Sequence, residues 1–501
     1  MEKRGGHTMV NGTSALKLQN TDTEIVDSVF LPDPLRYTSV SLNEVFDNNT
    51  RFEASAFNLD AKAAKYKVTH CKYGYTYLWG VNGLVKDAYV CGRFKRIYVE
   101  KNTNCIPFYL PSAITDVYPK PSKYISPKTD VDIDSLKVKK GMLLMSVSGT
   151  IGRCSIVGDY LDNAVFSHDM LRLYGLGKYD VGYIYAFFNT KIGQAILQTN
   201  NYGAVIQHIE PEHLRNIVIP NAPEEIRKEI HNLVIESYNL RDQSNALLDE
   251  AEKILYQELQ LPPIETLKPK YYDESIDLRN YTTRLKDLNL RLDGSYHIPI
   301  CKCIDLILKS TAKSIVLLGD KQITQSITLP GRFKRVYVDE NNGVQFLGGK
   351  DIFQLNPKTD KYLSLQKYKH QIEGELKILE NDILTPSRGT IGKVVSATKN
   401  FESKVISDNI INIRASNNDI AGYLYCFLNT TYGSIYIKRL IYGGVEDAME
   451  PQMLANLQIP ILKSTEKQSE INSKVLQANE LRYQAFLLEQ KAVKMMEGIM
   501  E

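Results

Sequence analysis

The chain has 501 residues, of which 43% are apolar and 24% are charged, and its formal net charge is +3. This length exceeds what one hydrophobic core usually serves, so two or more domains are expected. The composition excludes an extensively disordered protein, which would have fewer apolar residues and more net charge. The small net charge does not by itself indicate a nucleic-acid partner, because dedicated DNA-binding domains are often much more basic.

Neither a secretion signal nor a membrane-spanning segment is expected. The first residues lack an apolar core of signal-peptide length, and the longest apolar runs, such as 183–188, are far too short to cross a bilayer. The seven cysteines are scattered singly, apart from Cys301 and Cys303, and lack the paired spacing of a zinc site. We therefore expect a cytoplasmic protein with no membrane contact and no bound metal.

In chain order, residues 1–40 form an N-terminal extension that has no counterpart later in the sequence, and no role can be predicted for it. Residues 41–221 are expected to form the first globular domain. Short β-branched and aromatic runs such as 96–99, separated by Gly, Pro and Asn, predict mainly strands. A helical pattern over about 181–197 adds an α element, so the domain is expected to be α+β.

A long polar helix is predicted over 222–260. Its apolar residues alternate three and four positions apart, which is the heptad rhythm of a coiled coil. The predicted seam includes Ile230, Ser237, Leu240, Ser244, Leu247 and Ala251. Two consecutive prolines, Pro262 and Pro263, end this helix, and residues 261–282 are expected to link it to the second half of the chain.

The second half repeats the first, with a second domain expected over 283–462 and a second long helix over 463–501. Several unlike motifs recur about 240 positions apart: Gly92–Arg96 at 331–335, Gly149–Gly152 at 389–392, Tyr183–Thr190 at 423–430, and Tyr202-Gly203 at 442–443. Solenoid repeats are only a few tens of residues long, so this period indicates two tandem, pseudo-symmetric domains.

The second helix repeats the seam of the first 241 positions later. Its predicted seam residues are Ile471, Ala478, Leu481, Ala485, Leu488 and Ala492. Small residues at every seventh position allow two helix backbones to approach closely. We therefore predict that the two helices pack as an antiparallel coiled coil within one chain, forming a rod of about 50 Å with one domain at each end. A homodimeric coiled coil unconnected with DNA is the alternative.

No enzyme active site is recognisable in the sequence. There is no Asn/Asp-Pro-Pro-aromatic run of the kind that holds a flipped base in DNA methyltransferases. There is also no P-loop, because valine follows Gly392-Lys393. His208 and His213 have no counterparts in the second copy, so we interpret them as surface histidines rather than metal ligands.

The duplicated basic residues are the candidate DNA contacts. In Gly92–Arg96 a strand would place two cations on one face and Phe94 on the other, and 331–335 repeats this arrangement. Further cations lie beside the two glycine turns. The candidates are Arg93, Lys95, Arg96, Arg153, Arg332, Lys334, Arg335, Arg388 and Lys393. Phosphate or guanine contacts are one interpretation of these cations, and an edge strand protected by charge is the other.

Taken in order and doubled, these motifs resemble the specificity subunit of type I restriction-modification systems. The resemblance spans roughly residue 40 to the C-terminus. It rests on the Gly-Thr-Ile-Gly turns, the Tyr-x-Tyr-x-Phe-x-Asn-Thr stretches, the Tyr-Gly pairs and the Ile-Pro run before each helix. It implies that 41–221 and 283–462 are target-recognition domains for the two halves of a bipartite site. The helices would then be spacers. At the start of each helix the sequence departs from the Pro-Leu-x-Glu-Gln run that is common in the family.

The resemblance also implies partners. They are double-stranded DNA, two methyltransferase subunits, and restriction subunits that translocate and cleave DNA. S-adenosylmethionine would be bound by the methyltransferase partner, whereas this chain would bind no cofactor and would be non-catalytic. A protein scaffold and a stand-alone DNA-cleaving enzyme with an unrecognised site are the alternatives.

Overall fold

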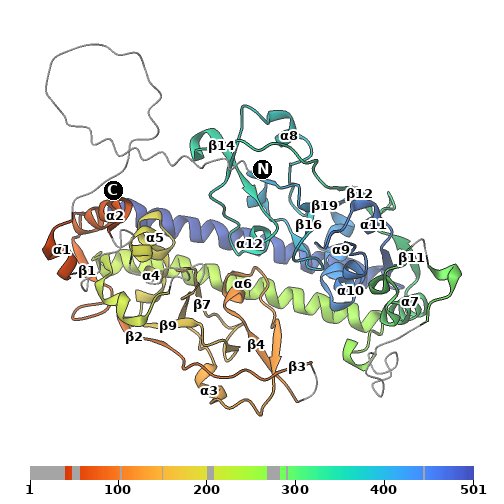
Figure 1. Cartoon of the computed structure of the whole chain (residues 1–501), viewed down its shortest axis with the longest axis horizontal. Helices are drawn as coiled ribbons and strands as arrows, with labels where there is room; N and C mark the ends of the chain where they lie inside the picture. The colour runs from red at the N-terminus through yellow and green to blue at the C-terminus, as the bar shows by residue number, and fades with distance from the viewer. Residues whose placement is uncertain are drawn as a thin grey trace, which may run out of the picture.

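Two long helices, α6 (Glu224–Glu258) and α12 (Thr465–Met500), run side by side through the whole molecule as a rod (Figure 1). The computed structural model describes residues 40–47, 57–101, 104–148, 151–199, 208–267, 282–288, 291–443 and 446–501. The expected N-terminal extension, apart from residue 40, lies outside the described residues. One domain lies on either side of the rod, the first toward its left end in Figure 1 and the second toward its right end.

The two helices of the rod run antiparallel, because the residue numbers of one rise as those of the other fall. The contacts that show this are Arg241 with Glu489, Asn245 with Arg482, and Glu250 with Lys474. Glu224 and Glu225 lie in the first turn of α6 and Glu466 lies in the first turn of α12, where a negative charge interacts favourably with the positive end of the helix dipole. The side chain of Ser464 also caps α12 by accepting the N–H of Lys467.

Small residues form the centre of the rod. Eight predicted seam residues are buried, namely Ile230, Ser237, Ser244, Ala251, Ile471, Ala478, Ala485 and Ala492. The other four, Leu240, Leu247, Leu481 and Leu488, are only partly buried, so their assignment to the seam needs correction. The buried positions beside the small residues are instead taken by Arg241, Arg482 and Glu489, which turns the leucines toward the flanks of the rod.

The first domain combines two four-stranded sheets with a two-stranded ladder. The strand orders are β2-β9-β6-β7, β3-β5-β4-β8 and β1-β10. Its elements are α1 (Leu42–Asp47), α2 (Leu59–Thr69), β1 (Tyr75–Tyr77), β2 (Val85–Val90), β3 (Tyr98–Val99), β4 (Ile106–Tyr109), β5 (Lys123–Ile125), α3 (Ile133–Leu136), β6 (Leu143–Ser146), β7 (Cys154–Ile156), β8 (Val165–Phe166), β9 (Met170–Gly175), α4 (Asp180–Phe188), α5 (Lys191–Thr199) and β10 (Val218–Pro220).

The second domain has the same topology, with strand orders β12-β19-β16-β17, β13-β15-β14-β18 and β11-β20. Its elements are α7 (Pro299–Thr311), β11 (Ser314–Leu317), β12 (Thr324–Thr328), β13 (Tyr337–Val338), β14 (Gly343–Leu347), β15 (Tyr362–Ser364), α8 (Lys369–Glu373), β16 (Ile383–Pro386), β17 (Val395–Ser396), β18 (Lys404–Ile406), β19 (Ile410–Ala415), α9 (Asn418–Asn429), α10 (Thr431–Arg439), α11 (Pro451–Ala455) and β20 (Gln458–Ile461). The predicted duplicated α+β fold with antiparallel helices is confirmed.

Each domain builds its core on both helices of the rod. The core of the first domain includes Ala492, Met496 and Ile499 from the end of α12. In the same way, the core of the second domain includes Leu248 and Leu255 from the end of α6. Each half of the chain therefore completes the hydrophobic core of the other half.

The helical pattern predicted over about 181–197 is two helices, α4 and α5, rather than one. Thr190 starts the second helix, because its Oγ1 accepts the N–H of Gly193 at 2.9 Å. A side chain at Gly193 would lie 2.1 Å from the carbonyl oxygen of Phe187, so the corner between the helices requires glycine. Thr430 and Gly433 form the same corner between α9 and α10.

Candidate nucleic-acid interface

The Tyr-x-Tyr-x-Phe stretches are buried and bind the strand that leads into each long helix, so they are not exposed for contact with a ligand. Tyr183 and Tyr423 are fully buried. The hydroxyl of Tyr183 donates to the carbonyl of Pro220 at 2.9 Å. In the second copy, the hydroxyl of Tyr423 donates to the carbonyl of Pro460 at 2.5 Å. These bonds hold the Ile-Pro strand that leads into each long helix, so the most distinctive duplicated motif has an architectural role.

The glycine before each of these tyrosines allows α4 and α9 to touch the rod. A Cβ at Gly182 would lie 2.8 Å from the Cα of His231, and one at Gly422 would lie 2.5 Å from the carbonyl oxygen of Asn472. The N–H of Gly182 donates to Nδ1 of His231 at 3.1 Å, and that of Gly422 donates to Oδ1 of Asn472 at 2.8 Å. Burial lowers the pKa of His231, which keeps its ring neutral and able to accept this bond.

The duplicated Gly-Arg-Phe-Lys-Arg segments are extended chains that lead into β3 and β13, and their side chains alternate as expected. The ring of Phe94 packs against that of Phe108, with centroids 6.3 Å apart, and Phe333 packs against Phe346 at the same separation. The cations on either side of each phenylalanine are exposed, and within the described residues they have no ion-pair partner. These cations are Arg93, Lys95, Arg332 and Lys334.

The last arginine of each segment is paired with a carboxylate of its own domain instead. Arg96 donates to Ser167 Oγ at 3.0 Å and to Asp169 Oδ2 at 2.8 Å. Arg335 pairs with Asp408. Each guanidinium also lies over a phenylalanine ring, Arg96 at 5.8 Å from the centroid of Phe108 and Arg335 over the ring of Phe346. These two arginines brace the segment, which leaves them less available for DNA than their neighbours.

The cations beside the glycine turns have unlike surroundings. Arg153 is exposed and has no ion-pair partner in the part of the chain that the structure describes. Arg388 pairs with Glu446 at 2.5 Å, and Nζ of Lys393 lies 4.0 Å from Asp116 of the first domain. Gly149 and Thr150 of the first turn lie outside the described residues. Arg153 is therefore the best placed of the three to meet a phosphate.

Each basic segment is followed by an exposed tyrosine that is not among the DNA contacts predicted from the sequence. Tyr98 is 47% exposed and Tyr337 is 43% exposed. They occupy equivalent positions in the two copies, in Arg-Ile-Tyr-Val and Arg-Val-Tyr-Val. A tyrosine beside cations offers a flat apolar face with a polar tip, which suits contact with sugars and bases. The repetition of the tyrosine at an exposed strand position was the signal that could have identified it.

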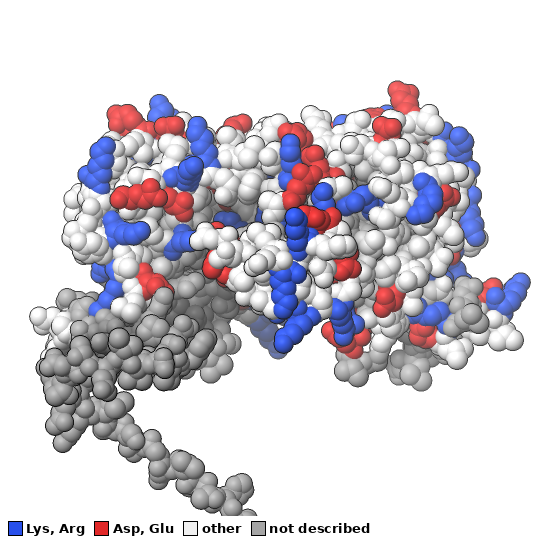
Figure 2. All heavy atoms as spheres, turned by 90° about the horizontal axis from the view of Figure 1, so that it is seen from above, with Lys and Arg blue, Asp and Glu red and all other residues white. Residues whose placement is uncertain are grey.

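Charge is mixed on the face that Figure 2 shows. Lys and Arg alternate there with Asp and Glu, and neither sign covers a broad area. A local group of exposed cations, rather than the net charge, would therefore have to attract a polyanion.

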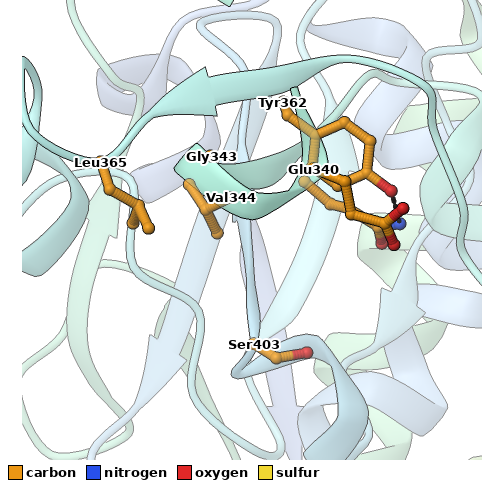
Figure 3. Close-up of a pocket in the computed structure, with 7 residues that line it drawn as sticks. Glu340, Gly343, Val344, Tyr362, Leu365 and Ser403 are labelled. Atoms are coloured by element: carbon orange, nitrogen blue, oxygen red, sulfur yellow. Dashed lines mark hydrogen bonds between the residues drawn. The ribbon is translucent and has the colours of Figure 1, made fainter. Parts of the chain in front are cut away.

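A hollow of about 380 Å³ in the second domain carries no recognisable catalytic arrangement (Figure 3). Glu340 and Tyr362 lie together on one side of it, and Ser403 lies apart from them. Glu340 is already paired with Lys191 of the first domain, and the hydroxyl of Tyr362 accepts a hydrogen bond from Gln345 at 3.3 Å. The hollow thus lacks the adjacent nucleophile and base that covalent catalysis requires.

A second hollow of about 430 Å³ lies between Tyr296, Asp305, Tyr436 and Arg439. Its charged groups contact one another, because Tyr436 donates to Asp305 and Arg439 lies 3.8 Å from the same carboxylate. Across the described ranges, no group of three or more His, Cys, Asp or Glu side chains is placed to hold a metal ion. No helix of the described residues combines the length and apolar character needed to span a membrane.

No family model matches the chain, and no curated protein matches its sequence. Among solved structures it is similar to the S subunit of a type I restriction-modification system from M. genitalium, at 14% identity and a TM-score of 0.30, over 85% of this chain and 98% of that one. The HsdS subunit from Thermoanaerobacter tengcongensis is 14% identical, with a TM-score of 0.25, over 84% of this chain and 97% of that one.

A third similar chain comes from a structure described as showing the complex assembly and conformational transition of the type I R-M system. It is 15% identical, with a TM-score of 0.26, over 85% of this chain and 96% of that one. Along most of its length the chain is thus similar to S subunits of type I restriction-modification systems, the family that its duplicated motifs resemble.

Proposed function

We propose that this chain is the non-catalytic DNA-reading subunit of a type I restriction-modification system. Each domain would read one half of a bipartite site in double-stranded DNA, and the rod would separate the two readers. The observation that carries the proposal is the duplication in space. Two domains of identical strand order flank one antiparallel rod, and each presents an exposed Arg-x-Lys segment.

The dimensions of the rod suit this role. Its helices have 35 and 36 residues, which at about 1.5 Å per residue make a rod of about 50 Å. Recognition elements of one DNA-binding protein commonly engage half-sites about one helical turn of DNA apart, roughly 34 to 36 Å. Two domains toward opposite ends of this rod could span that distance or somewhat more. Phosphate contacts by the exposed cations would supply affinity, and contacts with base edges would supply specificity.

The flanks of the rod offer a docking surface for two methyltransferase subunits. Leu240 on α6, and Leu481 and Leu488 on α12, are partly exposed, whereas Leu247 packs against the core of the second domain. Leu240 and Leu481 occupy equivalent positions of the two helices, which suits two copies of one helical partner, since each copy would meet the same residue. S-adenosylmethionine and the methyl transfer would belong to these partners, and restriction subunits would join the assembly.

The DNA contact is tested by the salt dependence of binding. In the variant Arg332→Ala/Lys334→Ala, we expect the slope of log K against log salt concentration to fall by about one for each phosphate that is no longer neutralised, hence by about two. The measurement is a titration of the full-length chain with long duplex DNA at several salt concentrations.

The matched control for this titration is Lys253→Ala/Lys494→Ala, which removes two exposed cations from the rod. The control is expected to keep the original slope. An unchanged slope in the Arg332→Ala/Lys334→Ala variant would exclude these side chains as phosphate contacts.

A further inference from the structure

The two domains touch each other across the middle of the rod through two loops that are not similar in sequence. The N–H of Val117 donates to the carbonyl of Phe353 at 2.8 Å, and the N–H of Leu355 donates to the carbonyl of Thr115 at 2.7 Å. Residues 116 and 354 face each other between these bonds as an antiparallel bridge. We name residues 115–118 and 353–356 together the clasp.

The second-domain side of the clasp is tied to the rod by a buried ion pair. The side-chain amide of Asn356 donates to one carboxylate oxygen of Glu489, and the other oxygen lies 2.5 Å from Nη2 of Arg241. Glu489 is fully buried, and Arg241 is 5% exposed. Burial raises the pKa of Glu489, but the charge of Arg241 outweighs this effect and holds the pKa below its usual value. Glu489 therefore stays ionised and fixes Asn356.

The first-domain side is tied to the rod by different groups. Nη2 of Arg482 donates to the carbonyl of Val117 at 3.2 Å, and the hydroxyl of Tyr118 donates to Asp249 of α6. Arg482 is the counterpart of Arg241, 241 positions later, whereas Leu248 stands where the first copy would need the equivalent of Glu489. The clasp is thus built from unlike partners on an otherwise duplicated rod.

The clasp also locks the domain cores together. Val117 of the first domain packs against a hydrophobic cluster of the second domain that includes Leu347, Ile352 and Leu384. Farther out, Nζ of Lys101 lies 3.4 Å from Glu265 in the segment that follows α6. A rotation of one domain about the rod would have to break the backbone bonds of the clasp and expose this packing.

We propose that the clasp positions the two domains relative to each other and thereby fixes the length of the gap tolerated between the two half-sites. The proposal rests on the proposed function. A change of one base pair in the gap shifts and rotates one half-site about the DNA axis, by about a tenth of a helical turn. Each domain is packed on both helices of the rod, so only a small turn of one domain could follow such a rotation, and the backbone bonds of the clasp oppose that turn. Asn356, Glu489 and Tyr118 would act as positioning residues without touching DNA.

The test is selection of bound duplexes from a random-sequence DNA library by the full-length chain. The wild-type protein is expected to enrich two half-site motifs at one gap. Asn356→Ala is expected to enrich the same two motifs. Its preference for the wild-type gap over gaps one base pair longer or shorter should fall about tenfold, because the variant loses a hydrogen bond to a charged group. Asn232→Ala, at an exposed position of α6, is the matched control and should keep the wild-type gap.

A second variant and a second measurement guard against misfolding. Tyr118→Phe removes only the hydroxyl that donates to Asp249. It should also lower the preference for the wild-type gap, by about threefold. Hydrogen exchange of the Val117 and Leu355 amides should accelerate in Asn356→Ala, while the amides of α9 stay protected.

Three results would overturn the proposal. If both variants select the wild-type gap with undiminished preference, the clasp does not set the gap, although the proposed function stands. If the clasp amides of Asn356→Ala exchange as slowly as those of the wild-type protein, Asn356 does not hold the clasp. If the wild-type chain enriches no bipartite motif, the proposed function fails together with the clasp.

Discussion

Arg241 and Glu489 face each other inside the rod, 2.5 Å apart and almost out of contact with water. Removing one partner of a buried ion pair leaves the other charge uncompensated, which typically costs about 3 to 5 kcal/mol. We therefore expect Glu489→Gln to lower the free energy of unfolding at pH 7 by about 3 kcal/mol, as measured by urea unfolding. Glu480→Gln, at an exposed position of the same helix, should have almost no effect.

The same pair predicts a dependence on pH. The pKa of Glu489 is lowered by folding, so its stabilisation is present above the unfolded value, about 4.3, and is lost as the pH falls through the folded value. The difference in stability between wild type and Glu489→Gln should therefore shrink in acid. Equal stability of the two proteins at pH 7 would contradict the assigned role of the pair.

Lys404 is a buried cation without a carboxylate partner among the described residues. It is 7% exposed, and its ammonium group donates to the carbonyl of Asn400. Burial, followed by the charge of Lys358, lowers the pKa of Lys404 to about 8. An unfolded lysine keeps its proton to about pH 10.4, so this group penalises the folded state below pH 8 and ceases to do so as the pH rises to the unfolded value.

Replacement of Lys404 by methionine should therefore stabilise the protein. We expect Lys404→Met to raise the free energy of unfolding at pH 7 by about 2 to 3 kcal/mol and to lose this advantage near pH 10.5. Urea unfolding at both pH values measures the effect. A variant no more stable than wild type at pH 7 would show that the ammonium group is better solvated than its surroundings indicate.

At the scale of elements, the contact between α9 and α12 requires glycine. A methyl group at Gly422 would meet the backbone of α12 2.5 Å away, whereas one at Gly498 of α12 would meet no atom within 4 Å. We expect Gly422→Ala to lower the free energy of unfolding by about 1 to 3 kcal/mol through overpacking. Gly498→Ala, the same substitution in open space, should instead stabilise helix α12 by up to about 1 kcal/mol. Thermal unfolding of both variants compares them, and equal effects would contradict the close contact.

The elements also show how far sequence patterns determined the fold. Heptad spacing identified both long helices and the small residues between them, since burial in a helix pair follows the helical period. It could not separate the buried leucines from the flanking ones, because Arg241, Arg482 and Glu489 occupy the core positions where apolar residues are expected. The helical pattern over about 181–197 did not show the break between α4 and α5, because the hydroxyl of Thr190 starts a new helix within the apolar pattern.

For the candidate DNA contacts, the sequence predicted which cations lie on the surface but not which of them form ion pairs. Alternation of polar and apolar residues placed the cations beside Phe94 and Phe333 on the surface. It could not show that Arg96 and Arg335 form ion pairs, because their carboxylate partners, Asp169 and Asp408, lie more than 70 residues away in the sequence. Whether the exposed cations bind DNA stays a prediction until the salt slope is measured.

At the scale of the whole molecule, the two domains are joined more tightly than a pair of domains at the ends of a rod. The expected rod is present, but the clasp adds a direct contact between domains at its middle. The contacts of the clasp could not be predicted from the repeat, because residues 115–118 and 353–356 differ at every position, although each stretch stands directly before a repeated Pro-Lys pair. The rod and the clasp together give the two domains one fixed relation to each other.

The central claim is that this chain selects a bipartite DNA site for a methyltransferase partner. Sequencing of methylated bases in cells that express the chain with its methyltransferase subunit tests it most directly. We expect methylated adenine at one two-part motif with a constant gap, and only when both chains are present. Methylation at the same sites without this chain, or methylation by this chain alone, would contradict the claim.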